Sequence, residues 1–126
     1  MAKDLDLEMQ REWTKLVSIL EERFGEGLDL DAIIFLIGVQ ELGQGHRRFK
    51  KNEKVDLMHI AICALLSRYG YYEFAGLDSQ GWPHWESLKP LPKLGAKSQM
   101  RLMKEAVLEY FRDAELIPAF KKSWII

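Results

Sequence analysis

The stretch LDAIIFLIGVQEL, residues 30–42, decides the fold because it has almost no polar face. Apolar side chains fall on all sides of it when it is drawn as a helix, and such a helix has to be buried. Periodicity does not separate it from a buried strand, and its β-branched residues favour a strand. Its length, between Asp29 and Gly43, exceeds that of the usual strand. We therefore expect a buried helix.

Helical patterns flank this stretch on both sides. Residues 5–24 repeat apolar side chains at steps of three and four and end at Gly25. Residues 53–69 predict a second strongly apolar helix, with Asn52 as its cap and Gly70 as its end. Two buried helices are difficult to enclose in one chain of this size. They therefore form either a central pair wrapped by the other helices or an interface with a second copy.

The C-terminal third predicts one long helix and a short one. Ser98 is expected to cap the long helix, whose buried stripe runs from Met100 to Ala114. Pro118 suits the first turn of a short final helix. The last residues, WII, carry no charge, so we expect that tail to be docked.

Two aromatic segments, GYYEFAG and GWPHWE, surround the turn residues LDSQ and predict a β-hairpin over about residues 71–86. The expected fold is thus mainly α. It is a compact domain of four to five helices spanning residues 1–126, with the short hairpin between the third and fourth helices. We find no internal repeat.

Composition excludes several classes of protein. The net charge of −1 argues against a nucleic-acid-binding protein, because nucleic-acid-binding domains are usually strongly basic. The lone Cys63 cannot form an intramolecular disulfide, which favours a reducing compartment. The acidic N-terminus has no signal-peptide pattern, and the longest apolar run, residues 32–39, cannot span a bilayer. We expect a cytoplasmic protein that needs no cofactor and no membrane partner.

The segments FKKNEKVDLMHIA and GYYEFAGLDSQGWPHWE resemble a small bacterial family associated with Bacteroidetes. The resemblance spans roughly residues 40–86. It implies a small cytoplasmic protein. That family has no assigned activity, so the resemblance supplies no cofactor and no catalytic residue.

The first candidate site lies on the helix predicted over residues 53–69. Asp56, His59 and Cys63 fall on one helical stripe. With Glu41 from the preceding helix, Asp56 and His59 are candidate metal ligands, and Cys63 is a candidate nucleophile activated by His59. Alternatively, Asp56 lies in the first turn only because the helix dipole stabilises its negative charge, and Cys63 is a small core residue. Because no second ligand pair is present, we expect no metal.

The second candidate site is the basic loop, residues 46–54, which carries five Lys or Arg residues against one carboxylate, a formal +4. Two glycines allow the backbone to approach an anion closely. The free N–H groups at the start of the following helix also favour negative charge. The alternative is a solvated turn. Together with the aromatic hairpin, the loop predicts docking of an anionic small molecule or an acidic protein. The expected ligand-binding residues are His46, Arg47, Arg48, Lys50, Lys51, Tyr71, Trp82 and His84.

The third candidate site is the hairpin. If residues 77–80 form its loop, Glu73 lies opposite His84, which would suit acid–base chemistry. One face would then carry polar and aromatic groups including Tyr71 and Trp82, while the other packs on the helices. The alternative is that the aromatic residues only cover the core. A triad of Ser79, His84 and Asp78 is not expected, because adjacent turn residues do not present triad geometry.

Three classes of function remain open, and we favour a small binding or interaction protein. A small enzyme would use Glu73, His84, His59 or Cys63, and should bring two such groups within hydrogen-bond reach beside a cleft. A structural protein would use the apolar helices as a dimer interface. A homodimer is expected in each case.

Overall fold

The computed structural model describes residues 2–45 and 47–113. In this part, four helices accompany one antiparallel hairpin, which confirms the mainly α prediction with a hairpin between the third and fourth helices. The predicted final helix at Pro118, the WII tail and Ala114 lie outside the described residues. The elements are α1 (Ala2–Phe24), α2 (Leu30–Leu42), α3 (Lys51–Ser67), β1 (Tyr72–Leu77), β2 (Pro83–Ser87) and α4 (Ala96–Asp113).

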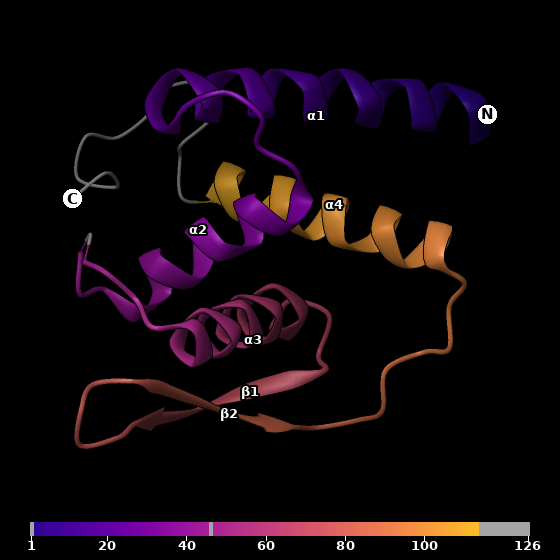
Figure 1. Cartoon of the computed structure of the whole chain (residues 1–126). Helices are drawn as coiled ribbons and strands as arrows, with labels where there is room; N and C mark the ends of the chain where they lie inside the picture. Colours follow the sequence, from indigo (N-terminus) through magenta and orange to yellow (C-terminus); the bar gives the residue numbers. More distant parts are fainter. Residues whose placement is uncertain (1, 46, 114–126) are drawn as a thin grey trace.

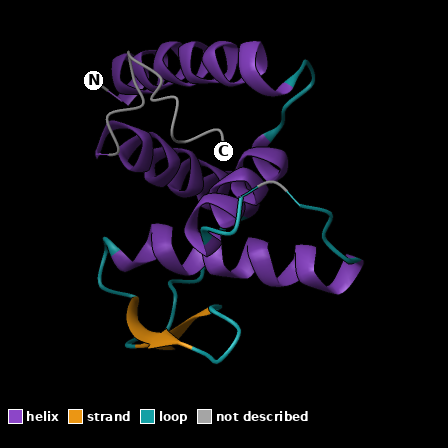
Figure 2. Cartoon of the chain, turned by 90° about the vertical axis from the view of Figure 1, so that its left-hand side faces the viewer, coloured by secondary structure: helices purple, strands orange, loops and turns teal. Residues whose placement is uncertain are grey.

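The elements are stacked in layers. Figure 1 shows α1 at the top, α2 and α4 below it, then α3, and the hairpin at the bottom. The view in Figure 2, turned by 90°, keeps α1 and the hairpin at opposite ends of the molecule. The hairpin therefore covers a face of α3 that is turned away from α1.

Helix α2 is buried as its sequence predicts. The side chain of Asp29 caps its start by accepting the Ala32 N–H at 2.9 Å. Gly43 ends it in the left-handed region, at φ 71°, and its N–H donates to the Val39 carbonyl. Large apolar residues on the other half of α2, namely Phe35, Leu36 and Val39, are partly buried, so no single apolar face is apparent in the sequence. The buried residues occupy one broad half of the helix. They are Ile33, Ile34, Ile37, Gly38 and Leu42.

A glycine lets α2 and α3 approach closely. A Cβ on Gly38 would lie 2.7 Å from the carbonyl carbon of Leu57, and closer still to its oxygen. Only a residue without a Cβ fits there without moving a backbone. The contact sets the spacing of the two apolar helices, which pack on each other as in the first of the two arrangements that the sequence left open.

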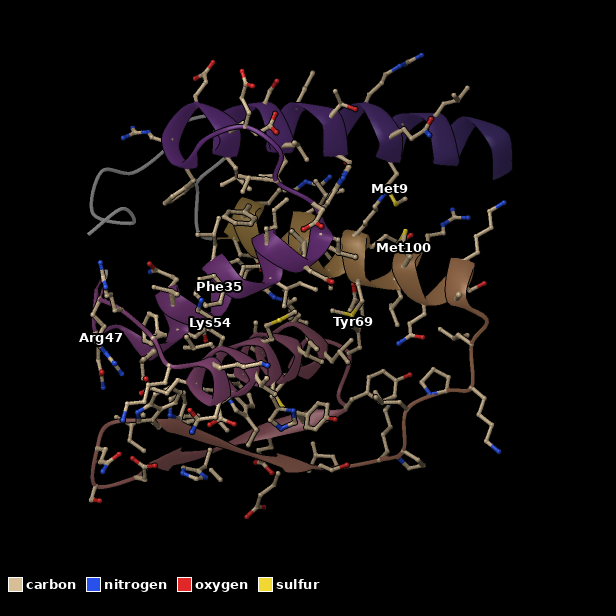
Figure 3. All side chains as sticks on the ribbon, viewed as in Figure 1. Met9, Phe35, Arg47, Lys54, Tyr69 and Met100 are labelled. Atoms are coloured by element: carbon tan, nitrogen blue, oxygen red, sulfur yellow. The ribbon has the colours of Figure 1, made fainter. Side chains whose placement is uncertain are left out.

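The core is built from all four helices. Its largest fully buried side chains include Leu16 and Leu20 from α1 and Phe111 from α4. The stripe expected on α4 has one error, because Met100 is 52% exposed. Figure 3 shows Met100 on α4, on the side of the molecule where the linker from the hairpin joins this helix. Ser98 also differs from its predicted role, because α4 begins at Ala96 and Ser98 lies inside it.

Helix α3 begins earlier than predicted. It starts at Lys51 with Lys50 as its cap residue, so Asn52 lies in the first turn and is not the cap. The carboxylate of Glu53 accepts the Lys50 N–H at 2.8 Å, which supplies half of a capping box. This contact from the Lys50 N–H to the Glu53 carboxylate does not need a Ser, Thr, Asp or Asn at the cap position. The prediction of Asn52 as the cap did not take it into account.

The apolar helices leave less surface uncovered than the sequence suggested. None of the large apolar side chains of α2 is strongly exposed, and Met58 and Ile62 of α3 are half-buried. Val55 is the exposed large apolar side chain of α3. The others among the described residues lie outside α2 and α3, and they are Leu7, Phe74, Leu77, Leu88, Leu91, Leu94 and Met100. None of the helices in the described part of the chain is both long and apolar enough to cross a membrane.

We predict that Gly38→Ala destabilises the protein although alanine is the better helix former. The added methyl group overlaps the Leu57 carbonyl, and overpacking of this kind costs about 1–3 kcal/mol or more. Urea denaturation should show a loss of at least about 2 kcal/mol in the free energy of unfolding. Gly95→Ala is the control, because nothing lies within 4 Å of the position that a Cβ would take there. It should change stability by less than about 0.5 kcal/mol. Equal effects of the two substitutions would contradict the close approach.

Candidate functional site

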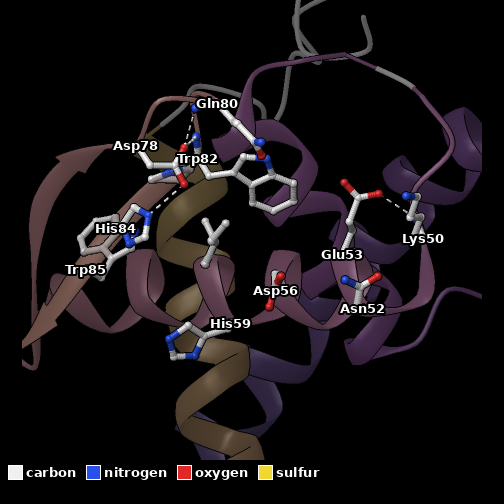
Figure 4. A pocket seen from close by; sticks show the side chains of 12 residues that line it. Lys50, Asn52, Glu53, Asp56, His59, Asp78, Gln80, Trp82, His84 and Trp85 are labelled. Carbon is white, nitrogen blue, oxygen red and sulfur yellow. Dashed lines mark hydrogen bonds and ion pairs between the residues drawn. The ribbon is translucent and has the colours of Figure 1, made fainter.

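A cleft of about 500 Å³ opens between α3 and the hairpin. Figure 4 shows the hairpin side chains on one wall and the α3 side chains on the other. This volume lies in the range of small-molecule sites. The lining residues are Lys50, Asn52, Glu53, Asp56, His59 and Ile60 from the loop and α3, and Asp78, Gln80, Trp82, Pro83, His84 and Trp85 from the hairpin.

The register of the hairpin differs from the one expected. Glu73 pairs with Glu86, and His84 lies opposite Gly76, so the predicted Glu73–His84 pair is wrong. The loop spans residues 78–82, longer and later than the predicted one, and it is closed by the Asp78 N–H donating to the Trp82 carbonyl at 2.9 Å. An irregularity between Phe74 and Gly76 changes the register once more, by one residue. Glu73 is exposed and does not line the cleft.

Asp78 organises the turn and holds a histidine. One carboxylate oxygen accepts the N–H groups of Gln80 at 2.9 Å and Trp82 at 3.0 Å. Its other oxygen lies 3.0 Å from Nε2 of His84. These hydrogen bonds, first that with His84 and then those from the backbone, lower the pKa of Asp78. The sequence indicated Asp78 as a turn residue, and its only pairing with His84 considered there was in the triad with Ser79, which was not expected. The observed contact between Asp78 and His84 depends on the register.

His59 and Asp56 form the α3 wall of the cleft, and both are exposed. Behind them, the Cys63 sulfur lies 3.5 Å from Nε2 of His59. Cys63 is fully buried, and this burial raises the pKa of its thiol to about 11. A thiol with a raised pKa is protonated at neutral pH and a weak nucleophile. The geometry therefore favours Cys63 as a core residue.

Glu41 lies apart from Asp56 and His59. Its carboxylate accepts the hydroxyl of Tyr110 at 2.9 Å, which ties the end of α2 to α4. Burial, followed by the nearby charge of Glu41, raises the pKa of Tyr110. Within residues 2–45 and 47–113, no three His, Cys, Asp or Glu side chains gather closely enough to hold a metal ion. The three candidate metal ligands are thus not brought together.

The basic loop is partly neutralised by its own carboxylate. The guanidinium of Arg47 lies 3.3 Å from the Glu53 carboxylate and 4.4 Å from the centre of the Phe49 ring. The pKa of Glu53 is lowered, mainly by the Lys50 N–H and also by Arg47. Arg47 therefore supports the start of α3. Gln44, two residues before this loop, donates to the Gln80 carbonyl at 3.0 Å and ties the connection between α2 and α3 to the hairpin turn.

The residues expected to bind a ligand divide into three groups. Lys50, Trp82 and His84 line the cleft. Arg48 and Lys51 are exposed beside it. The remaining predicted residues lie elsewhere: Arg47 is paired as described, the ring of Tyr71 lies under the Lys89 ammonium at 4.5 Å, and His46 lies outside the described residues.

Comparison of the chain with protein-family models, with curated proteins and with solved structures gives no match. The function therefore has to be argued from the residues and their geometry.

We predict that Asp78→Ala loosens the hairpin turn, whereas Asp78→Asn preserves most of it because the amide oxygen still accepts backbone N–H groups. Amide hydrogen exchange at Gln80 and Trp82 measures the effect, and it should be faster in the alanine variant. Because the pKa of Asp78 is lowered in the folded protein, its contribution is complete above the unfolded value of about 4. That contribution is lost as pH falls through the lower folded value. Unchanged exchange in Asp78→Ala would contradict this role.

Proposed function

We propose that this protein is a small binding or interaction protein and that its ligand docks in the cleft between α3 and the hairpin. The observation that carries the proposal is the convergence itself. Polar and aromatic side chains from two parts of the chain, residues 50–60 and 78–85, line one hollow of about 500 Å³. Such a mixture of aromatic walls and a few oriented polar groups is typical of ligand sites.

The basic loop extends this site at one end. Lys50 lines the cleft, and Arg48 and Lys51 are exposed next to it, without an ion pair to any described residue. Their potentials add, so an acidic protein surface or the anionic part of a ligand would be steered to this end. Arg47 serves this surface indirectly, because its pairing with Glu53 holds the loop against the start of α3.

A small enzyme is the second candidate, favoured by one observation. Asp78 and His84 lie within hydrogen-bond reach of each other beside the cleft, as an acid–base site requires. The carboxylate would orient the imidazole, and His59 lines the opposite wall. The participation of Glu73 and Cys63, expected from the sequence, has less support. Glu73 lies outside the cleft, and Cys63 is buried with a raised pKa.

We further propose a homodimer in a cytoplasmic location. The support for a dimer is a second, apolar hollow of about 600 Å³ where the starts of α2 and α4 meet the end of α3. Leu91, Leu94 and Met100, all exposed, line it. Apolar patches of this kind mark interfaces more often than ordinary surface. For the location, the support is a single free cysteine that is buried.

A fragment screen followed by NMR tests the proposed site. The indole N–H signals of Trp82 and Trp85 report on the cleft, and that of Trp13 on α1 is an internal control, because it lies outside the cleft and its ring lies 5.2 Å from the Lys104 ammonium. We expect small polar fragments to shift the first two signals and leave the third unchanged. A screen in which the two cleft signals never move, or move only together with that of Trp13, would contradict the proposal.

The same experiment examines the basic end. Among fragments that bind the cleft, those with a carboxylate or phosphate should bind more weakly to an Arg48→Ala, Lys51→Ala double variant. Two exposed charges at about 0.2–1 kcal/mol each predict a loss of about two- to thirtyfold. Lys93→Ala with Lys97→Ala is the matched control, removing two exposed positive charges elsewhere. Equal losses in both double variants would show that only net charge matters.

A further inference from the structure

The charges in the cleft are unevenly distributed. Three carboxylates line it, those of Glu53, Asp56 and Asp78, against a single ammonium, that of Lys50. The Glu53 charge is offset by Arg47. Figure 4 shows Asp78 at the end of the cleft away from Lys50, and Asp56 on the α3 wall between the two. The lining of the cleft therefore carries more negative than positive charge, whereas the adjacent loop is basic. The loop by itself suggested an anionic ligand.

Two walls face each other at this end. Figure 4 shows Asp78 and Trp82 on the hairpin above Asp56 and His59 on α3. Asp78 is held by backbone hydrogen bonds and by His84, which fixes its carboxylate at the cleft. Like any carboxylate whose pKa is not raised, it is ionised at neutral pH. A group that enters between the walls thus meets negative charge from the hairpin and from α3.

We propose that this end of the cleft accommodates the ammonium group of a small organic cation, between Asp56, Asp78 and the indole of Trp82. The inference rests on the proposed function and narrows the class of its ligand. Aromatic faces attract cations by about 0.5–2 kcal/mol, most strongly when the cation is desolvated and the ring is Trp. Trp82 is half-buried and lines the cleft, so its ring is positioned before the ligand arrives.

An organic cation fits better than a metal ion for two reasons. In the described part of the chain, no three His, Cys, Asp or Glu side chains are close enough together to coordinate one ion. The hollow, at about 500 Å³, is also far larger than a coordination site. An ammonium group with methyl or methylene substituents is attracted by carboxylates without needing a coordination shell of several ligands. It also presents an apolar surface to an indole.

The test uses three probes at constant ionic strength: choline, its neutral isostere 3,3-dimethylbutan-1-ol, and inorganic phosphate. The readout is the indole N–H signal of Trp82. Choline and the alcohol have nearly the same shape, so their difference measures the effect of positive charge. We expect choline to shift the signal in the millimolar range, and the alcohol to bind at least about fivefold more weakly, since one charge–ring contact contributes about 1 kcal/mol.

Asp56→Asn should weaken choline binding by up to about fivefold, because one charged contact near the surface contributes about 0.2–1 kcal/mol. Asp56 is exposed, and the substitution keeps its shape, so folding should be preserved. Glu26→Gln, an exposed carboxylate on the α1–α2 connection, is the matched control and should have no effect.

Three results would overturn the inference while leaving the binding function intact: equal binding of choline and the alcohol, indifference to Asp56→Asn, or a Trp82 shift with phosphate but not with choline. Failure of every fragment and of all three probes to perturb Trp82 and Trp85 would instead overturn the proposed function itself. The two failures are therefore distinguishable in one set of spectra.

Discussion

The close approach of α2 and α3 at Gly38 is the constraint on which the rest of the structure depends. Because a Cβ there would overlap the Leu57 carbonyl, the two apolar helices have one tight mutual arrangement. That arrangement buries Leu57 completely and exposes Asp56 and His59 along another side of α3. The hairpin follows α3 after a short turn and covers part of that side. The cleft is therefore a consequence of how the central helix pair is packed.

Most of the helical fold could be predicted from the sequence because its patterns are local. The bounds of α2 match the apolar run between Asp29 and Gly43, and the structure shows that these two residues cap its ends. The cap of α3 was missed because it depends on a backbone N–H reaching the Glu53 carboxylate, which a preference for Asn at caps does not describe. Met100 follows the apolar spacing of α4 yet is exposed, because spacing alone does not show where the packed face of a helix ends.

The site was harder to predict because it depends on register and on long-range contacts. The existence of the hairpin followed from its aromatic and turn residues, but an irregularity at Ala75 and the longer loop moved every cross-strand pair. As a result, the partner of His84 is Asp78 and not Glu73. Glu41 pairs with Tyr110, distant in sequence, and its partner could not be read from helix spacing. The concentration of chemistry-bearing residues between positions 50 and 85, in contrast, was apparent.

The basic loop and the acidic cleft end illustrate how folding redistributes charge. In the sequence, the Lys and Arg residues after Gly45 dominate the segment, whereas in the structure Arg47 is paired with Glu53 and the cleft receives more carboxylates than ammonium groups. One end of the site therefore suits an anionic partner and the other a cationic group. A ligand that carries both kinds of charge would match the full length of the cleft.

The most direct test of this account is a nuclear Overhauser measurement on the free protein in solution. The central claim is that the hairpin leans over the first half of α3 and forms a cleft with it. Ile60 is the apolar residue of α3 that lines the cleft together with Trp82 and Trp85. The account predicts cross-peaks from the Ile60 methyl groups to the indole protons of at least one of these tryptophans. Cross-peaks confined within the hairpin and within α3, with none between them, would contradict it.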